Sequence, residues 1–185
     1  MTNIWFTSDT HFGHANIIKY CNRPFATAEE MDEALIANHN ARVKPGDHWY
    51  HLGDVIMGDR SRLASIMSRL NGKKRLIPGN HDSYTHDLYR FFEKVMHWRV
   101  FKDHRLVCTH MPLHPSGLRF GDYEALNVHG HIHDKMVYLG TGVPDMRYRC
   151  VSVEHTGYAP VHIDEVRTFI STVPPAPPEP RNSNH

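Results

Sequence analysis

Residues 76–82 (LIPGNHD) place three polar side chains directly after a short apolar run. A buried strand that ends in this way delivers these side chains to the loop beyond its carboxyl end, where open α/β sheets place their functional sites. Gly79 allows a turn or a close approach of the backbone, because glycine has no Cβ. Asn80 offers an amide oxygen as a metal ligand, and His81 can carry a proton near neutral pH. The segment therefore predicts a loop suited to metal binding or proton transfer.

Four further strand-like segments end in side chains of the same kind. They end at Asp9 with His11, at Asp54, at His110, and at His131 with His133. Alternate residues of an extended chain point to the same side, so each closely spaced pair would share a side. A polar turn after an edge strand is the alternative for residues 9–14 taken alone. The recurrence at five strand ends predicts that these ends converge on one site.

The combined set holds two carboxylates, one amide and four imidazoles, and it holds no thiolate. Structural zinc sites favour closed tetrahedra rich in cysteine, so this composition argues against one. Nitrogen and oxygen ligands instead suit an open site for Mn²⁺, Fe²⁺ or Zn²⁺. Seven side chains are too many for one ion that keeps open positions. Two ions about 3.5–4 Å apart, sharing one carboxylate, fit the number of ligands.

Eight short apolar or β-branched runs predict the strands that position these side chains. They cover residues 3–8, 47–52, 76–77, 98–101, 105–109, 126–128, 149–153 and 160–163. Alternation points His51 away from the face of Leu52, which predicts a hydrogen-bonded core histidine, with a ligand role as the alternative. Residues 73–75 (KKR) are expected to be a solvated lead-in to the strand at Leu76, with a phosphate-facing patch as the alternative.

Helices are predicted between these strands, and two of them carry clear sequence patterns. Thr27 and Glu30 form a capping box that begins a helix running to about Val43. Apolar residues spaced i, i+3, i+4 and i+7 from Leu63 to Leu70 predict a helix that faces a core. A short helix with a loop over 15–26 and helices over 84–93 and 164–171 complete the set.

The composition is that of an ordinary soluble domain, apart from 17 histidines spread along the chain. A length of 185 residues and a net charge of +1 predict one domain without bulk attraction to nucleic acid or membrane. Cys21, Cys108 and Cys150 are expected to be reduced thiols in a cytoplasmic protein. We expect no signal peptide or membrane span. The domain should cover residues 1–172, followed by a disordered Pro-rich tail over 173–185.

The five motifs resemble those of the calcineurin-like metallophosphoesterases. They are DxH at Asp9, GD at Asp54, GNHD at Asn80, His110, and GHxH at His131, and they follow the order of that family across residues 9–133. The flanking sequence is similar to small single-domain bacterial and phage members over nearly all of residues 1–170. The resemblance implies an α/β (α+β) fold, a four-layer sandwich of two mixed β-sheets packed face to face and flanked by helices.

The resemblance also implies a role for each side chain. One divalent ion would be held by Asp9, His11, Asp54 and His133, and the other by Asp54, Asn80, His110 and His131. Mn²⁺ is the expected metal, with Fe²⁺, Zn²⁺ and Ni²⁺ as alternatives. A metal-bridging hydroxide would attack phosphorus, and His81 would protonate the leaving oxygen or stabilise the phosphoryl charge. Asp82 would orient His81.

Departures from the family narrow the expected substrate. Phosphoprotein phosphatases carry Asp-Arg where this chain has Met57 and Gly58, which argues against a Ser/Thr protein phosphatase. The chain lacks an evident cap insertion, so we expect an open site that hydrolyses phosphodiesters of a nucleotide or a small nucleic-acid-derived substrate. A phosphomonoesterase, a catalytically silent scaffold and a nucleic-acid-binding module are the alternatives. His14, His114 and Arg119 are candidate phosphate contacts, with ordinary surface roles as the alternative.

Overall fold

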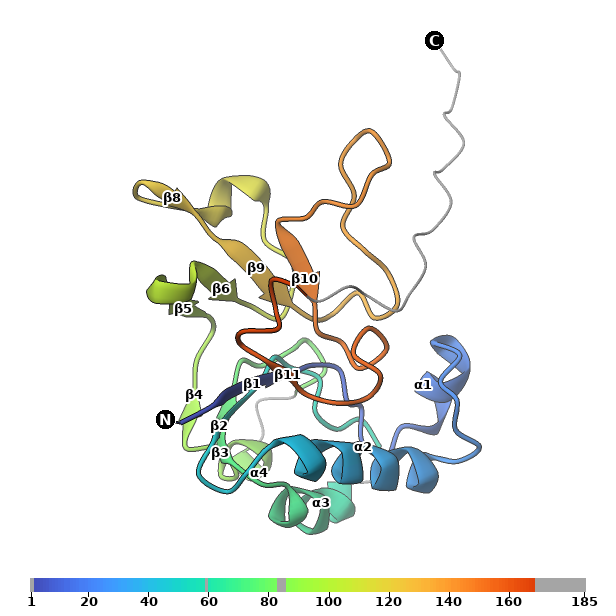
Figure 1. The fold of residues 1–185 in the computed structure, drawn as a ribbon. Coiled ribbons are helices and arrows are strands. Elements are labelled where there is room, and N and C mark those ends of the chain that lie inside the picture. The colour runs from blue at the N-terminus through green and yellow to red at the C-terminus, as the bar shows by residue number, and fades with distance from the viewer. Residues whose placement is uncertain (1, 59, 83–85, 169–185) are drawn as a thin grey trace, which may run out of the picture.

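Two mixed β-sheets lie face to face in the computed structural model, which describes residues 2–58, 60–82 and 86–168 (Figure 1). The first sheet, in spatial order, contains β11 (Val161–His162), β1 (Ile4–Thr7), β2 (His48–His51), β3 (Lys73–Leu76) and β4 (Lys94–Val95). The second contains β10 (Tyr148–Cys150), β9 (Leu126–His129), β6 (Leu106–Cys108) and β5 (Arg99–Phe101). Only β11 and β5 run antiparallel to their described neighbours. The predicted pair of mixed sheets is confirmed.

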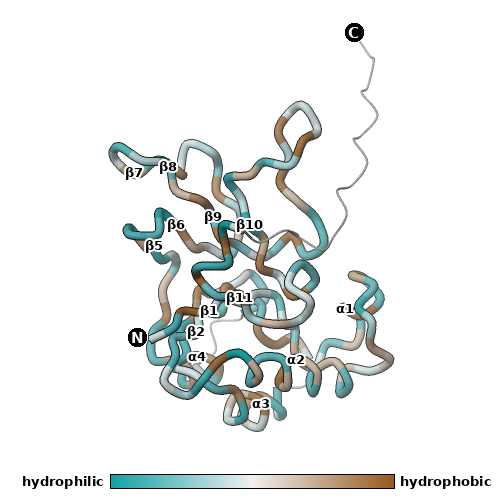
Figure 2. The backbone as a smooth tube through the Cα atoms, viewed as in Figure 1, coloured by the Kyte–Doolittle hydropathy of each residue, from teal (hydrophilic) through white to brown (hydrophobic). Residues whose placement is uncertain are grey.

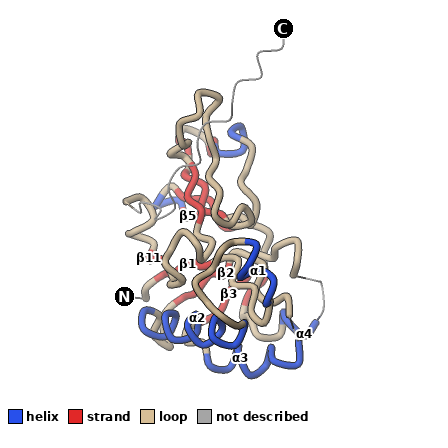
Figure 3. The backbone as a smooth tube through the Cα atoms, turned by 90° about the vertical axis from the view of Figure 1, so that its right-hand side faces the viewer, coloured by secondary structure: helices blue, strands red, loops and turns tan. Residues whose placement is uncertain are grey.

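The α-helices lie by the first sheet, and three of them cover the face turned away from the second sheet (Figures 1 and 3). They are α1 (Ala15–Tyr20), α2 (Ala28–Arg42), α3 (Leu63–Arg69) and α4 (His86–Tyr89), of which α2, α3 and α4 form that layer. The predicted capping box begins α2, because the Thr27 hydroxyl accepts from the Glu30 N–H at 3.1 Å and the Glu30 carboxylate accepts from the Ala26 N–H. None of the described helices is long and apolar enough to cross a membrane.

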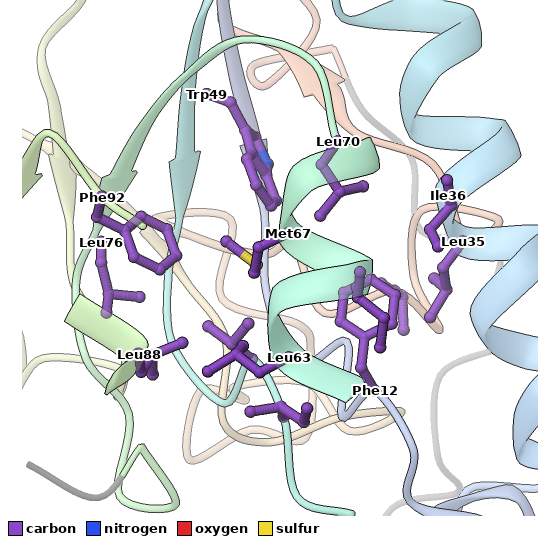
Figure 4. Close-up of a cluster of buried hydrophobic side chains, with 14 of the residues drawn as sticks. Phe12, Leu35, Ile36, Trp49, Leu63, Met67, Leu70, Leu76, Leu88 and Phe92 are labelled. Atoms are coloured by element: carbon purple, nitrogen blue, oxygen red, sulfur yellow. The ribbon is translucent and has the colours of Figure 1, made fainter. Parts of the chain in front are cut away.

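Alternation along the central strands builds a core on each face of the first sheet. Trp49 and Leu76 point toward the helices, where they meet Met67 and Leu70 from the end of α3 (Figure 4). Phe6 and Tyr50 point the other way, into a second core between the sheets. Because neighbouring strand residues face opposite layers, the central strands of this sheet bury apolar side chains on both of its faces.

The outer face of the second sheet has a different cover. A 3₁₀ turn, η3 (Pro115–Leu118), and the hairpin of β7 (Arg119–Phe120) with β8 (Tyr123–Glu124) lie over Val107 and Tyr148. The hairpin tip is hydrophilic in Figure 2. Two further 3₁₀ turns, η1 (Arg60–Arg62) and η2 (Lys102–His104), complete the described elements. The fourth layer is thus made of turns and a hairpin where the family resemblance implied helices.

Residues 73–75 correct one expectation, because they form strand β3 itself. The Arg75 guanidinium lies 5.6 Å from the centroid of the Tyr50 ring, and Arg75 is buried. The Lys74 ammonium donates to the Leu70 carbonyl at 2.6 Å. The long aliphatic stems allow Lys74 and Arg75 to lie along a packed strand, so only Lys73 keeps the exposed position expected of a solvated lead-in.

Two predicted helices are also shorter or absent in the described residues. Only 86–89 of the predicted 84–93 helix is helical, and residues 83–85 lie outside the described part. Residues 90–93 form turns instead, and the Glu93 N–H pairs with the Lys74 carbonyl at the open edge of β3, where β4 begins at Lys94. Residues 164–168 form turns with i+3 hydrogen bonds, and 169–171 and the predicted tail over 173–185 lie outside the described residues.

Candidate metal centre

The seven predicted ligands all follow strands at one edge of the two sheets. Asp9 and His11 follow β1, Asp54 follows β2, Asn80 follows β3, His110 follows β6, and His131 and His133 follow β9. Within each sheet these strands are parallel, so their carboxyl ends meet at one edge. Ser8 joins the two edges, because its N–H donates to the Val151 carbonyl and its carbonyl accepts from the Val153 N–H. The sheets therefore bring the loops together.

Two groups of ligand atoms form there, and Asp54 lies between them. Within the described residues, Asp9, His11 and His133 offer atoms that all lie within 4.8 Å of one another, and so do Asp54, His110 and His131. The second group also contains Asn80, whose Oδ1 lies 3.0 Å from His110 Nε2 and 2.9 Å from His131 Nδ1. Asp54 Oδ2 lies 3.7 Å from His11 Nε2 and 3.5 Å from His110 Nε2. This oxygen can serve both groups.

The backbone at these ligands is strained. Positive φ angles between 50° and 70° occur at Asp9, His11, Asp54, His131 and His133. A left-handed backbone costs an L-residue on the order of 1 kcal/mol, and such residues gather at functional sites. The ligand pairs therefore do not share a side by extended alternation, as the sequence suggested. Tight left-handed turns direct them, and His131 and His133 belong to different groups.

Two glycines allow the loops to approach each other. Gly53 has a φ of +99°, and a Cβ there would collide with the backbone of Gly79 and the ring of His110. A Cβ at Gly79 would collide with the Asp54 carboxylate. Glycine is thus required both before Asp54 in the β2 loop and opposite it in the β3 loop. This requirement explains why glycine stands between strand and ligand in both loops.

The state of the imidazoles fits cation binding. Both ring nitrogens of His11 are buried and lack a hydrogen-bond partner among the described residues, and burial lowers its pKa to about 2. His110 donates from Nδ1 to the Leu52 carbonyl at 2.7 Å, which leaves the Nε2 lone pair facing Asn80 and Asp54. The lone pairs of His110, Asn80 and Asp54 therefore face one another. Burial also raises the pKa of Asp54. Divalent cations that accept nitrogen and oxygen ligands fit such a set.

Sequence reasoning missed a buried ion pair behind His133. Glu154 Oε1 accepts from His133 Nδ1 at 3.1 Å and from Arg23 Nε and Nη2 at 2.9 and 2.7 Å. Arg23 also donates to the carbonyls of Asp9 and Thr10. Burial alone would raise the pKa of Glu154, but the His133 hydrogen bond and the Arg23 charge lower it to about 2. The Arg23–Glu154 pair therefore fixes the ring of His133 and the loop that carries Asp9.

A third cluster of possible ligands overlaps this pair. Cys21, His133 and Glu154 also offer atoms within 4.8 Å of one another. The Arg23 guanidinium already makes two hydrogen bonds to Glu154, so its positive charge disfavours a cation beside that carboxylate. Cys21, Cys108 and Cys150 are all free, as the sequence predicted. The cluster is consistent with a shell that supports His133.

His81 and Asp82 lie in the loop after β3, where the His81 ring is exposed and the Asp82 carboxylate is buried. The His81 N–H donates to Asp54 Oδ1 at 2.9 Å, and its exposed ring lies 5.7 Å from that of His11 between centroids. The buried Asp82 carboxylate accepts from the N–H groups of Asp54, Val55 and Gly79 at 2.7–2.9 Å. Asp82 therefore ties the β2 loop to the β3 loop. Its predicted role in orienting the His81 ring stays a prediction.

The remaining histidines and Arg119 differ in their surroundings. His51 is the predicted core histidine, since its Nδ1 accepts from the Gly53 N–H and its Nε2 lies 2.9 Å from the Thr10 hydroxyl. His14 lies beside His11, with 5.5 Å between ring centroids. His114 caps η3 through Ser116, and Arg119 lies exposed on the β7–β8 hairpin. Of the candidate phosphate contacts, the structure places only His14 against a predicted ligand.

Comparisons with known proteins identify the family of this chain. The model of the calcineurin-like phosphoesterase family matches residues 2–148. The uncharacterized protein MJ1445 of Methanocaldococcus jannaschii is 36% identical over 176 residues, which cover 92% of each chain. The Gene 66 protein of Mycobacterium phage D29 is 27% identical, covering 94% of this chain and 98% of its own. Among solved structures, AQ665 of Aquifex aeolicus, a protein of unknown function, superposes with a TM-score of 0.68 at 27% identity, covering 92% of this chain and all of its own.

Proposed function

Because the chain belongs to the calcineurin-like phosphoesterase family, we propose that it is a dinuclear metal-dependent phosphodiesterase acting on a nucleotide or a small nucleic-acid-derived substrate. One observation carries the proposal. Asp54 Oδ2 lies within 3.7 Å of a ring nitrogen from each ligand group. A carboxylate oxygen in that position can be shared by two cations, which is the arrangement of two-metal hydrolytic sites.

The ligand groups would divide between two cations in the way that the family resemblance implies. Asp9, His11 and His133 would hold one cation, Asn80, His110 and His131 the other, and Asp54 both. When bound, two divalent cations such as Mn²⁺ supply Lewis-acid polarisation of the phosphoryl oxygens and an activated water near neutral pH. The left-handed turns and the buried hydrogen bonds behind the ligands hold these side chains in place before binding.

His81 is proposed as the proton donor. Its backbone is fixed by the bond to Asp54 Oδ1, while its ring is exposed beside the ligand groups. In the proposed step, water loses one proton to solvent and forms a bond to phosphorus, the bond from phosphorus to the leaving oxygen breaks, and the His81 imidazolium gives its proton to that oxygen. General acid catalysis of this kind typically contributes about 10²–10⁴ in rate.

The first experiment measures turnover of bis-p-nitrophenyl phosphate with and without Mn²⁺, for wild type and Asp54→Asn. We expect metal-dependent turnover that Asp54→Asn abolishes, because the shared oxygen loses its charge. Asp122→Asn, the same change on the exposed hairpin tip, should behave as wild type. Turnover that ignores both the metal and Asp54 would remove the hydrolase proposal. No turnover of this ester or of p-nitrophenyl phosphate with any of the four metals would favour the silent scaffold.

A second experiment tests the role of His81. His81→Ala should slow diesters with alkyl leaving groups by 10²-fold or more and slow p-nitrophenyl esters much less, because p-nitrophenolate leaves without protonation. His114→Ala removes another exposed histidine and serves as the control. An equal loss on both kinds of ester would contradict proton donation to the leaving oxygen.

A further inference from the structure

A cavity of about 260 Å³ opens beside His81, and the mechanism above does not use it. It lies between Ile56 with residues 60–64 on one side and residues 87–91 on the other. From this cavity we infer that the substrate is a nucleotide phosphodiester whose leaving group is itself a nucleotide, held here by its base and its own phosphate. The inference rests on the proposed function and specifies its substrate class.

The floor of the cavity is apolar. Ile56, Leu63 and Leu88 line it and are buried in the core that contains α3 and α4, as Figure 4 shows for the two leucines. Phe91 adds a partly buried aromatic ring at the side. Stacking on an aromatic ring is the common way to bind a nucleobase without reading its identity. The volume lies below the roughly 300–1,000 Å³ of sites for drug-sized ligands, so it suits a single base rather than a longer oligonucleotide.

The rim of the cavity carries cations. Arg60 and Arg90 line it from opposite segments. The Arg90 guanidinium lies 5.1 Å from the centroid of the Phe91 ring and only loosely pairs with Asp87, at 4.0 Å, with 63% of the Arg90 side chain exposed. Guanidinium groups bind phosphate with two parallel hydrogen bonds. An aromatic ring with a guanidinium beside it therefore matches a base attached to a phosphate.

The position of His81 assigns the cavity to the leaving group. His81 lines the cavity and is the residue proposed to protonate the leaving oxygen. In that step water adds to phosphorus, the bond to the leaving sugar oxygen breaks, and the proton from His81 converts that oxygen to a hydroxyl. A group that leaves toward His81 departs into the cavity, so the base and phosphate held there belong to the alcohol product.

The experiment compares the dinucleotide pApA with bis-p-nitrophenyl phosphate at saturating Mn²⁺, using Phe91→Leu and Arg90→Ala. Each variant should raise KM for pApA about tenfold, since stacking alone contributes 5-fold or more per base, while kcat changes less than twofold. Arg90→Ala should keep wild-type kinetics on bis-p-nitrophenyl phosphate, whose leaving group carries no phosphate for the guanidinium to bind. Arg99→Ala, which removes an arginine from the face of Phe101 on β5, is the matched control. Wild-type KM for ApA, which lacks the 5′-phosphate, should resemble that of Arg90→Ala for pApA.

The outcomes separate this inference from the proposed function. Metal-dependent hydrolysis of bis-p-nitrophenyl phosphate without hydrolysis of pApA would overturn the cavity assignment and leave the phosphodiesterase proposal standing. An unchanged KM for pApA in both variants, or an equal loss on both esters in Arg90→Ala, would overturn it as well. Thermal unfolding of each variant detects misfolding, and Phe91→Tyr, which keeps an aromatic ring, should restore the wild-type KM if stacking is the cause.

Discussion

Replacing Glu154 by Gln should cost the protein stability, because it leaves the buried Arg23 guanidinium without its counter-charge. The side chains of Arg23 and Glu154 are 0% and 4% exposed, and their closest nitrogen and oxygen are 2.7 Å apart. Removing one partner of a buried pair costs about 3–5 kcal/mol. Glutamine keeps an oxygen acceptor, and Arg23 keeps its bonds to the carbonyls of Asp9 and Thr10. We therefore expect the lower end of the range, about 3 kcal/mol.

The same substitution should weaken one of the two metal sites. Glu154 accepts from His133 Nδ1, which directs Nε2 toward Asp9 at 4.0 Å. Loss of such a partner behind a ligating histidine typically lowers metal affinity 10–100-fold. The site of His110 and His131 should keep its affinity.

Two assays separate these effects. Urea unfolding in EDTA measures stability, and calorimetric titration with Mn²⁺ measures each site. Glu33→Gln is the matched control, because Glu33 makes a two-bond pair with Arg69 at 2.6 and 2.7 Å on the surface. That variant should match wild type in both assays. The reasoning fails if Glu154→Gln unfolds like Glu33→Gln, or if it binds two Mn²⁺ ions with wild-type affinities.

Two further predictions concern a buried histidine and a glycine. Burial lowers the pKa of His39 from 6.5 to about 4, so between these pH values the unfolded chain binds a proton that the folded chain does not. His39 should therefore account for about 3 kcal/mol of the stability that urea unfolding shows to be lost as the pH falls from 6.5 to 4. His39→Gln, which can keep the bond to the Asn71 carbonyl, should lose less, and equal losses would contradict this. Gly79→Ala should abolish calorimetric Mn²⁺ binding at the Asp54 group, because the new Cβ would collide with that carboxylate, and normal binding of two ions would refute this.

The sequence indicates which loops carry the candidate ligands, because the pattern that marks each loop is local. An apolar strand followed by glycine and a polar residue describes the segments at Asp54 and Asn80 completely, and parallel strands bring such ends together. The backbone conformation could not be predicted in the same way. Alternation assumes an extended chain, but Asp9 and His11 have φ angles of 55° and 50°, set by hydrogen bonds to the β2 loop.

The Arg23–Glu154 pair shows where local reasoning stops. The two residues lie 131 positions apart, and Arg23 stands in an irregular loop without a pattern. The local indication was the carboxylate of Glu154, which directly follows the predicted strand over residues 149–153 and would need a charged partner if buried. The expectation that residues 73–75 are solvated was wrong for Lys74 and Arg75 for the opposite reason, because a local pattern was given too much weight. Three cations in a row suggest exposure to solvent. The backbone pairing of β3 with β2 and β4, and the contact of Arg75 with the ring of Tyr50, outweigh that tendency.

The strain at the ligands and the bonds behind them belong to one arrangement. Lone pairs of His11, His110 and Asp54 face one another. Such an arrangement does not stabilise the folded chain unless a cation lies between the acceptor atoms. The loops nevertheless stay in this geometry, because Asp82 ties three backbone N–H groups and Arg23 ties two carbonyls. These five bonds lie outside the ligand set and need no metal. The free-energy cost of bringing the acceptor atoms together is therefore offset during folding. Because a cation does not have to organise its ligands on binding, it binds with higher affinity.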